Sequence, residues 1–150
     1  MAYVTAGRGR EGSPRPCLRA GAAYEGSTES IADARVLART FLDEVRDSGV
    51  RVSERAWSDA QLVVSELVTN ACKYAPGPCA LSLEVDGPAL EITLWDSEPA
   101  LPMARAAEPG RIGQHGLEIV FALCDGFEVR REPVGKRISV RLSLHLHGVG

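Results

Sequence analysis

The chain has 150 residues, of which 45% are hydrophobic and 25% are charged, and its formal net charge at pH 7 is −3. This length fits one domain with a hydrophobic core of its own. The weak acidic balance gives no electrostatic reason to expect binding to nucleic acid or to an anionic membrane surface. The first residues lack the apolar segment of a signal peptide, and no apolar run is long enough to span a membrane. We therefore expect a cytoplasmic protein, whose four cysteines lack metal-ligand spacing and behave as small buried hydrophobic residues.

The N-terminal part of the chain is expected to contain a tail, a strand and a helix. Residues 1–16 are rich in Gly, Arg and Pro without periodicity, which predicts a disordered tail ahead of a domain over residues 17–147. Alternation then predicts an edge strand with Leu18, Ala20, Ala22 and Tyr24 on one face. An apolar stripe at helical spacing follows, and predicts a helix that Ser30 would cap and Gly49 would close.

The rest of the chain predicts two helices and two hairpins. A helix runs roughly from Trp57 to Ala75, where "PGP" stops it. Alternating runs joined by "DGP" at 86–88 predict one hairpin, and a second hairpin turns at Pro133–Gly135. Between them lie a long loop typical of a lid and a short helix, "LEIVFALC". This order predicts an α+β two-layer sandwich, with the helices on one face of a mainly antiparallel mixed sheet.

The segment "SELVTNACKYA" carries polar residues on the side of its helix that faces away from the apolar stripe. Turned by about 100° per residue, Asp59, Glu66, Asn70 and Lys73 cluster there. A carboxylate beside an amide oxygen suits Mg²⁺ and its waters, and Glu66 could also act as a general base. Every amphipathic helix has a polar face, however, so the helix alone leaves a binding site and a solvated surface open.

Two further segments carry candidate ligand-binding residues. Asp96 ends an apolar strand where the chain enters the loop, so it could hold a ligand amine or simply form a turn. Gly113 and Gly116 precede a helix, and glycines there let backbone N–H groups close on a phosphate. A flexible loop would have the same composition. His115, between these glycines, is either a phosphate donor or an exposed loop residue.

Taken in order and spacing, these segments resemble the motifs of the GHKL superfamily of ATPases. "DAQLVVSELVTNACKYA" is similar to its N-box helix, "ITLWDSEPALP" stands where its aspartate box does, and "GQHGLEIVFALCDGFEVR" resembles its second glycine box. The branch that fits best comprises the bacterial anti-sigma-factor serine kinases and their small ATP-binding relatives. The resemblance implies a Bergerat-type ATP-binding fold and a Mg-ATP-dependent kinase that phosphorylates a small antagonist protein and sequesters a sigma factor. Members of this branch are often dimers, so it also allows a homodimer.

The resemblance also implies a role for each matching residue. Asn70 would ligate the Mg²⁺ that bridges the ATP phosphates, and Glu66 would be the general base on a protein serine hydroxyl or on water. Asp96 would accept a hydrogen bond from the adenine amino group. Other residues near the nucleotide would be the basic Lys73, the lid residues Gly113, His115 and Gly116, and Leu117, which would open the following helix.

Several positions depart from the family pattern. "DSEPA" replaces Asp-x-Gly-x-Gly, "GQHG" replaces the commoner Gly-Arg-Gly, Tyr74 stands where His is common, and Arg137 stands where a Thr often helps the aspartate to hold adenine. These changes favour ATP binding over efficient phosphoryl transfer. Three functions stay open: a serine kinase, a non-catalytic ATP-binding regulator acting by partner sequestration, and a domain of the same shape without a nucleotide.

Overall fold

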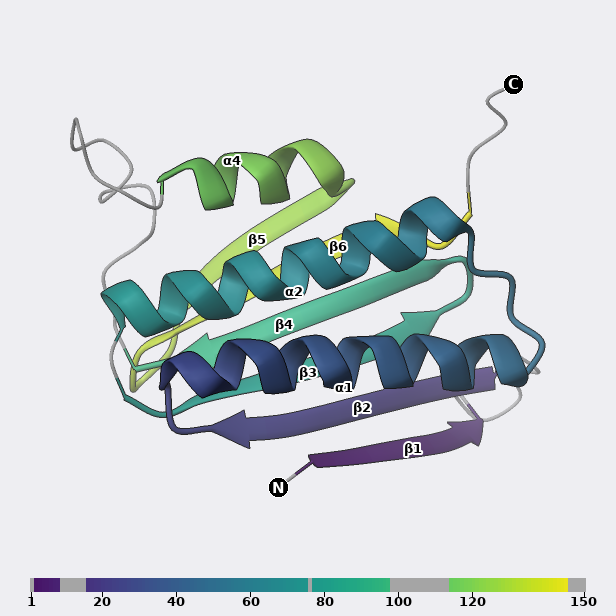
Figure 1. The fold of residues 1–150 in the computed structure, drawn as a ribbon, viewed down its shortest axis with the longest axis horizontal. Helices are drawn as coiled ribbons and strands as arrows, with labels where there is room; N and C mark the ends of the chain where they lie inside the picture. Colours follow the sequence, from purple (N-terminus) through teal and green to yellow (C-terminus); the bar gives the residue numbers. More distant parts are fainter. Residues whose placement is uncertain (1, 9–15, 76, 98–113, 146–150) are drawn as a thin grey trace.

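One antiparallel sheet forms the base of the molecule in the computed structural model, which describes residues 2–8, 16–75, 77–97 and 114–145 (Figure 1). Its six strands lie in the order β1-β2-β3-β4-β6-β5, and every neighbouring pair is antiparallel. The strands are β1 Ala2–Arg8, β2 Pro16–Tyr24, β3 Cys79–Asp86, β4 Ala89–Asp96, β5 Gly126–Arg131 and β6 Lys136–Ser143. The expected α+β sandwich is confirmed, although the described strands contain no parallel pair of the kind that a mixed sheet would have.

The N-terminal segment differs from its prediction. A disordered tail over residues 1–16 is wrong for Ala2–Arg8, which form β1 and pair with β2 from Ala2↔Ala22 to Arg8↔Pro16. The strand β2 therefore lies between β1 and β3, and is not the predicted edge strand. The reason is tertiary: an edge strand presents unpaired backbone N–H and C=O groups, and a neighbouring segment can pair with them whatever its own hydrophobic pattern. Residues 9–15 lie outside the described part of the chain.

Three helices of the described chain cover one face of this sheet (Figure 1). They are α1 Thr28–Asp47, α2 Glu54–Tyr74 and α4 Gln114–Leu123. The cap of α1 is Ser27 and not the predicted Ser30, which is buried inside the helix. Ser53 caps α2, because its side chain accepts a hydrogen bond from the Ala56 backbone N–H at 3.0 Å.

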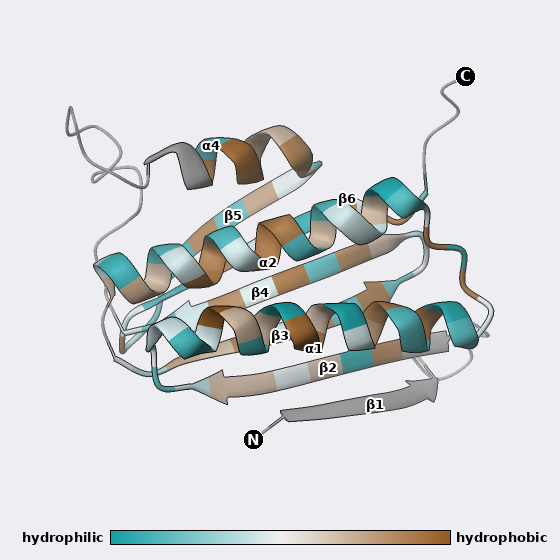
Figure 2. Cartoon of the chain, in the orientation of Figure 1, coloured by the Kyte–Doolittle hydropathy of each residue, from teal (hydrophilic) through white to brown (hydrophobic). Residues whose placement is uncertain are grey.

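The core lies between the helices and the inner face of the sheet. Alternate residues of the strands point into it, and Figure 2 shows hydrophobic and hydrophilic residues following each other along β4. On the helices the fully buried residues recur every three or four positions, as an amphipathic helix requires. The buried strand residues include Leu18, Ala20, Leu81, Leu83, Leu90, Ile92, Ile138 and Val140, and the buried helix residues include Phe41, Val63, Leu67 and Val68.

Candidate functional site

The elements that carry the predicted residues meet at one end of the sandwich (Figure 1). The last turn of α2 leads into β3, and β4 ends beside the start of β3, because Ala80 pairs with Trp95. The start of β6 lies on the other side of this strand end, where Lys136 pairs with Asp96. Figure 1 shows that the first turn of α4 lies at the same end. The fold therefore brings together the ends of four elements that are distant in sequence.

Backbone contacts hold these strand ends and turns close to one another. The Ser97 hydroxyl donates to the Pro78 carbonyl at 2.9 Å, which joins the exit of β4 to the entry of β3. Gly135 has φ +80°, and a Cβ at this position would overlap the Asp96 carbonyl oxygen. Only glycine fits such a close approach with positive φ, so the turn before β6 packs directly on the end of β4.

Glu66 and Asn70 lie one turn apart on α2, and both are half-buried. The residues between and beside them on the inner side of the helix, Leu67 and Ala71, are buried against the core. The amide and the carboxylate thus stand at the rim of the core, on the same side of the helix, as the sequence predicts. Lys73 lies in the last turn of α2 and is exposed.

Asp96 forms a buried ion pair with Lys136. The Lys136 Nζ and Asp96 Oδ2 atoms are 2.8 Å apart, and the two side chains are only 2% and 1% exposed. Asp96 is therefore a buried strand residue and not the turn-forming aspartate of the alternative interpretation. Its carboxylate faces the helices and is held by a cation in a charge-assisted hydrogen bond.

The position of Lys136 corrects the prediction for the last hairpin. Arg137 was expected next to the aspartate, but it lies on the outer face of the sheet, 3.9 Å from carboxylate oxygens of both Glu128 and Glu132. Lys136 occupies the inner position instead. The signal that could have found it is the alternation of β6: since Ile138 and Val140 point inward, residue 136 does too.

The lid residues are described only in part. Gly113 lies outside the described residues, and the exposure and contacts of His115 and Gly116 are not described either. The backbone places His115 and Gly116 inside α4, which begins at Gln114, so Leu117 does not open the helix as expected. Leu117 is buried, with 5% of its surface exposed. The phosphate-binding roles of these residues stay predictions.

Burial keeps the thiols of Cys72, Cys79 and Cys124 protonated at neutral pH. Burial raises the pKa of Cys79 to about 11, and the nearby Cys72 and Asp96 add to this shift. Burial also raises the pKa of Cys72, whose thiol donates to the Ser27 carbonyl at 3.3 Å. The pKa of Cys124 rises to about 12, mainly through burial. A protonated, partly or fully buried thiol behaves as a small hydrophobic residue, which agrees with the prediction for these three cysteines.

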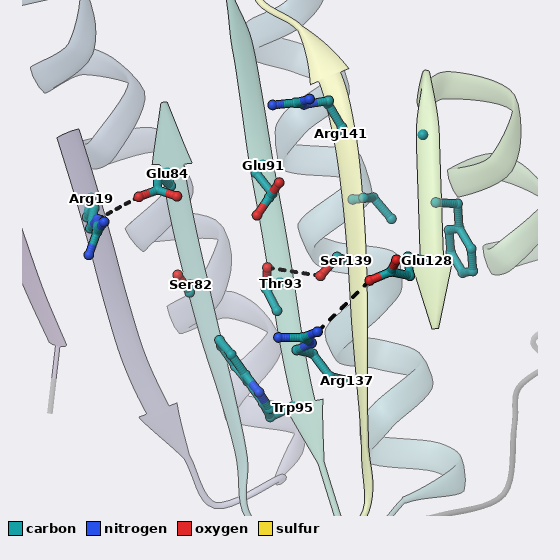
Figure 3. Close-up of a pocket in the computed structure, with 13 residues that line it drawn as sticks. Arg19, Ser82, Glu84, Glu91, Thr93, Trp95, Glu128, Arg137, Ser139 and Arg141 are labelled. Atoms are coloured by element: carbon teal, nitrogen blue, oxygen red, sulfur yellow. Dashed lines mark hydrogen bonds and ion pairs between the residues drawn. The ribbon is translucent and has the colours of Figure 1, made fainter. Parts of the chain in front are cut away.

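Two hollows lie away from this end of the inner layer. One, of about 470 Å³, lies on the outer face of the sheet, where Trp95, Arg137 and Glu91 line it (Figure 3). Some of its charged side chains form ion pairs, as Arg19 does with Glu84 at 2.6 Å. The second, of about 300 Å³, includes Asp59, which therefore lies apart from the other polar residues of α2.

Neither a preformed metal cluster nor a membrane-spanning helix occurs among the described residues. No three His, Cys, Asp or Glu side chains among them come together as a cation site. Mg²⁺ typically takes only one or two protein oxygens and completes its shell with water and substrate phosphates, and the oxygens of Asn70 and Glu66 fit such a donor set. None of the helices seen in the described chain is long and apolar enough to cross a bilayer.

Comparisons with known proteins agree with this architecture. Residues 28–142 match the family model of the histidine kinase-like ATPase domain. No curated protein matches the sequence significantly. The structure of the RsbU and RsbW domains of Rv1364c from Mycobacterium tuberculosis is similar to 88% of this chain, with a TM-score of 0.58 and 19% identity. This chain spans 33% of that one, and the likeness shows a common fold.

Two histidine kinases give weaker structural matches. The histidine kinase domain of the blue-light activated kinase EL346 from Erythrobacter litoralis matches 59% of this chain and 44% of its own, with a TM-score of 0.44 and 24% identity. AdeS from Acinetobacter baumannii matches 84% of this chain and 68% of its own, with a TM-score of 0.47 and 12% identity.

Proposed function

The chain belongs to the histidine kinase-like ATPase family, and we propose that it binds Mg-ATP at the end of the sandwich where α2, β4 and β6 meet. The observation that carries this proposal is the buried Asp96 carboxylate, which faces the helix layer at that end. An acceptor fixed at a strand end can take the amino group of adenine. The polar residues of α2 then lie on the side of the site where the phosphates would be.

Within this proposal, the residues of α2 act on the phosphates. Asn70 would hold Mg²⁺ together with the phosphates, and Lys73, in the last turn, would add a positive charge near them. Bound Mg²⁺ supplies neutralisation of the charge that develops on the transferred phosphoryl group. Glu66 would accept the proton of the attacking hydroxyl. The amide groups at the start of α4, with Gly113, His115, Gly116 and Leu117, would close over the anionic phosphates.

The reaction that we propose is phosphorylation of a serine in a small antagonist protein, by a protein that also sequesters a sigma factor. The similarity of the N-box, "DAQLVVSELVTNACKYA", to the anti-sigma-factor kinase branch supports it. The fold shared with the RsbU–RsbW structure agrees with such a role. A cytoplasmic location and a homodimer belong to the same proposal.

The alternative is an ATP-binding regulator without transfer, acting by partner sequestration. It is favoured by "DSEPA" and "GQHG", which lack the usual glycines and arginine of the nucleotide-binding boxes. Stiffer and less basic loops can still hold a nucleotide while positioning its γ-phosphate poorly, and phosphoryl transfer depends almost entirely on positioning and electrostatics.

Calorimetric titration with Mg-ATP, followed by a phosphotransfer assay with a candidate antagonist, tests these proposals. We expect binding by the wild type, loss of binding in Asp96→Ala, and loss of transfer without loss of binding in Glu66→Ala. Glu44→Ala, an exposed glutamate of α1, is the matched control and should behave as wild type. Binding without transfer supports the regulator, and no binding of ATP contradicts both.

A further inference from the structure

The hollow of about 470 Å³ on the outer face of the sheet owes its shape to the register of the strands (Figure 3). Its floor consists of small hydroxyl residues that lie side by side on β3, β4 and β6, namely Ser82, Thr93 and Ser139. Longer side chains form a wall on either side of this row. One wall contains Trp95 and Arg137, and the other contains Glu84, Glu91 and Arg141. The hollow is therefore a trough across the strands, about 10 Å long from β3 to β6.

One carboxylate in the walls of this trough has no counter-charge. Each arginine that lines the trough has a carboxylate oxygen 2.6–3.9 Å away, in the pairs Arg19–Glu84, Arg137–Glu128 and Arg141–Asp86. Glu91 stands between Glu84 and Arg141 in the register, but its carboxylate forms no ion pair or hydrogen bond with the described residues. Glu91 is half-buried and lines the trough. This wall therefore favours a cationic group in whatever the trough binds.

The opposite wall combines an exposed aromatic ring with hydrogen-bond donors. Trp95 is 36% exposed, and exposed tryptophans are common anchors of protein interfaces, because they bury a large apolar area. The Arg137 side chain is 30% exposed and lies 3.9 Å from the carboxylate oxygens of Glu128 and Glu132, which is too far for a hydrogen bond. Its guanidinium can therefore donate to an acceptor that enters the trough.

An extended peptide with a basic residue next to an apolar one matches both walls. At about 3.3 Å per residue, about three extended residues span the trough. Successive side chains of an extended chain point to opposite sides, so one can reach Glu91 while the next lies on Trp95. The hydroxyl groups of the floor both donate and accept, as a peptide backbone requires.

We propose that this trough is a docking site for an extended segment of a partner protein, in which a lysine or arginine stands next to an apolar residue. The basic group pairs with Glu91, the apolar side chain covers Trp95, and Arg137 donates to a peptide carbonyl. The trough lies on the face of the sheet opposite to the helices (Figure 3). The inference therefore goes beyond the proposed nucleotide site and does not depend on nucleotide binding.

An NMR titration with short peptides tests this proposal, because the chain has two tryptophans. The indole N–H signal of Trp95 reports on the trough, whereas that of Trp57, which donates to Asp43 at 3.2 Å, reports on the helix layer. The probe is a blocked hexapeptide, Gly-Ser-Arg-Leu-Ser-Gly, compared with versions in which glutamate replaces arginine or glycine replaces leucine. We expect the first peptide to shift the Trp95 signal and not that of Trp57, and the glutamate peptide to bind at least about tenfold more weakly. No shift of Trp95, or equal binding of the three peptides, overturns the proposal.

A substitution that removes only the charge tests the role of Glu91. Glu91→Gln keeps the shape of the side chain, and the Kd of the arginine peptide should rise about threefold, as expected for a partly exposed ion pair. Glu44→Gln, at an exposed position of α1, should leave this Kd unchanged. An unchanged Kd in Glu91→Gln overturns the proposal, and the three peptides on the wild type decide the matter if the variant does not fold. Sedimentation tests a second copy as the occupant: a wild-type dimer that Trp95→Asp dissociates would also overturn the proposal.

Discussion

Removing the charge of Lys136 should destabilise the protein far more than removing both charges of its ion pair. At 2.8 Å, two unit charges attract by about 6 kcal/mol with an effective dielectric constant of 20. Desolvation of the two groups offsets much of this attraction in the native protein. In Lys136→Met the desolvation of Asp96 stays while its ion pair with the ammonium is lost, so we expect a loss of about 3–5 kcal/mol. At about 2–4 °C per kcal/mol for a domain of this size, the melting temperature should fall by about 6–20 °C.

Urea unfolding without nucleotide measures this loss, and two variants serve as comparisons. The double variant Asp96→Val/Lys136→Met buries no charge and should lie within about 2 kcal/mol of the wild type. Arg141→Met breaks an exposed ion pair with Asp86 and should cost no more than about 1 kcal/mol. If Lys136→Met costs as little as Arg141→Met, the pair is solvated in solution, and its description as a buried fixed element is refuted.

Four further predictions concern the turns, the helix caps and the thiols. Gly135→Ala should lower the free energy of unfolding in urea by more than about 2 kcal/mol, because the added Cβ would overlap a backbone carbonyl. Gly49→Ala, at φ +98° but with open space around it, should lower it by about 1 kcal/mol through backbone strain alone. Equal losses would show that the close approach at Gly135 is absent. Ser53→Ala should lower the free energy of unfolding by about 1 kcal/mol and Ser27→Ala by markedly less, because of these two N-caps only the Ser53 side chain accepts a capping hydrogen bond. The reverse order would contradict this cap geometry. The thiol of Cys79 should react with iodoacetamide at pH 8 much more slowly in the native protein than in urea. Because the pKa of Cys79 rises from 9.0 to about 11 on folding, the native state binds the thiol proton more tightly than the unfolded state does. The stability that this group contributes should therefore be lost as the pH rises from about 9 to 11. The free energy of unfolding of Cys79→Ala should depend less on pH over this range than that of the wild type.

Most of the sandwich could be predicted from the sequence because its signals are local. The alternation of Leu81, Leu83 and Val85 already separates the buried face of β3 from its outer face. The stripe of α2 likewise fixes which side Glu66 and Asn70 take, because residues four apart on a helix share a face. These patterns need no knowledge of what each element packs against, so the helices, both hairpins and one wall of the candidate site follow from them.

Features set by pairing between distant segments were missed. The strand β1 has no signal of its own beyond a few β-forming residues, and it exists through its register with β2. The ion pair of Asp96 likewise depends on the register of β4 with β6, which brings together residues 40 positions apart. Each segment shows an ordinary local pattern, and the contact appears only when the two strands are placed side by side.

The difference between Lys136 and Arg137 shows how much chemistry one step of register decides. Successive side chains of a strand point to opposite faces, so of two adjacent basic residues only one can reach the inner layer. With Arg137 inside, a planar guanidinium would fork onto Asp96 and occupy the carboxylate by two hydrogen bonds. With Lys136 inside, a compact ammonium binds Oδ2 and leaves Arg137 to the carboxylates of the outer face.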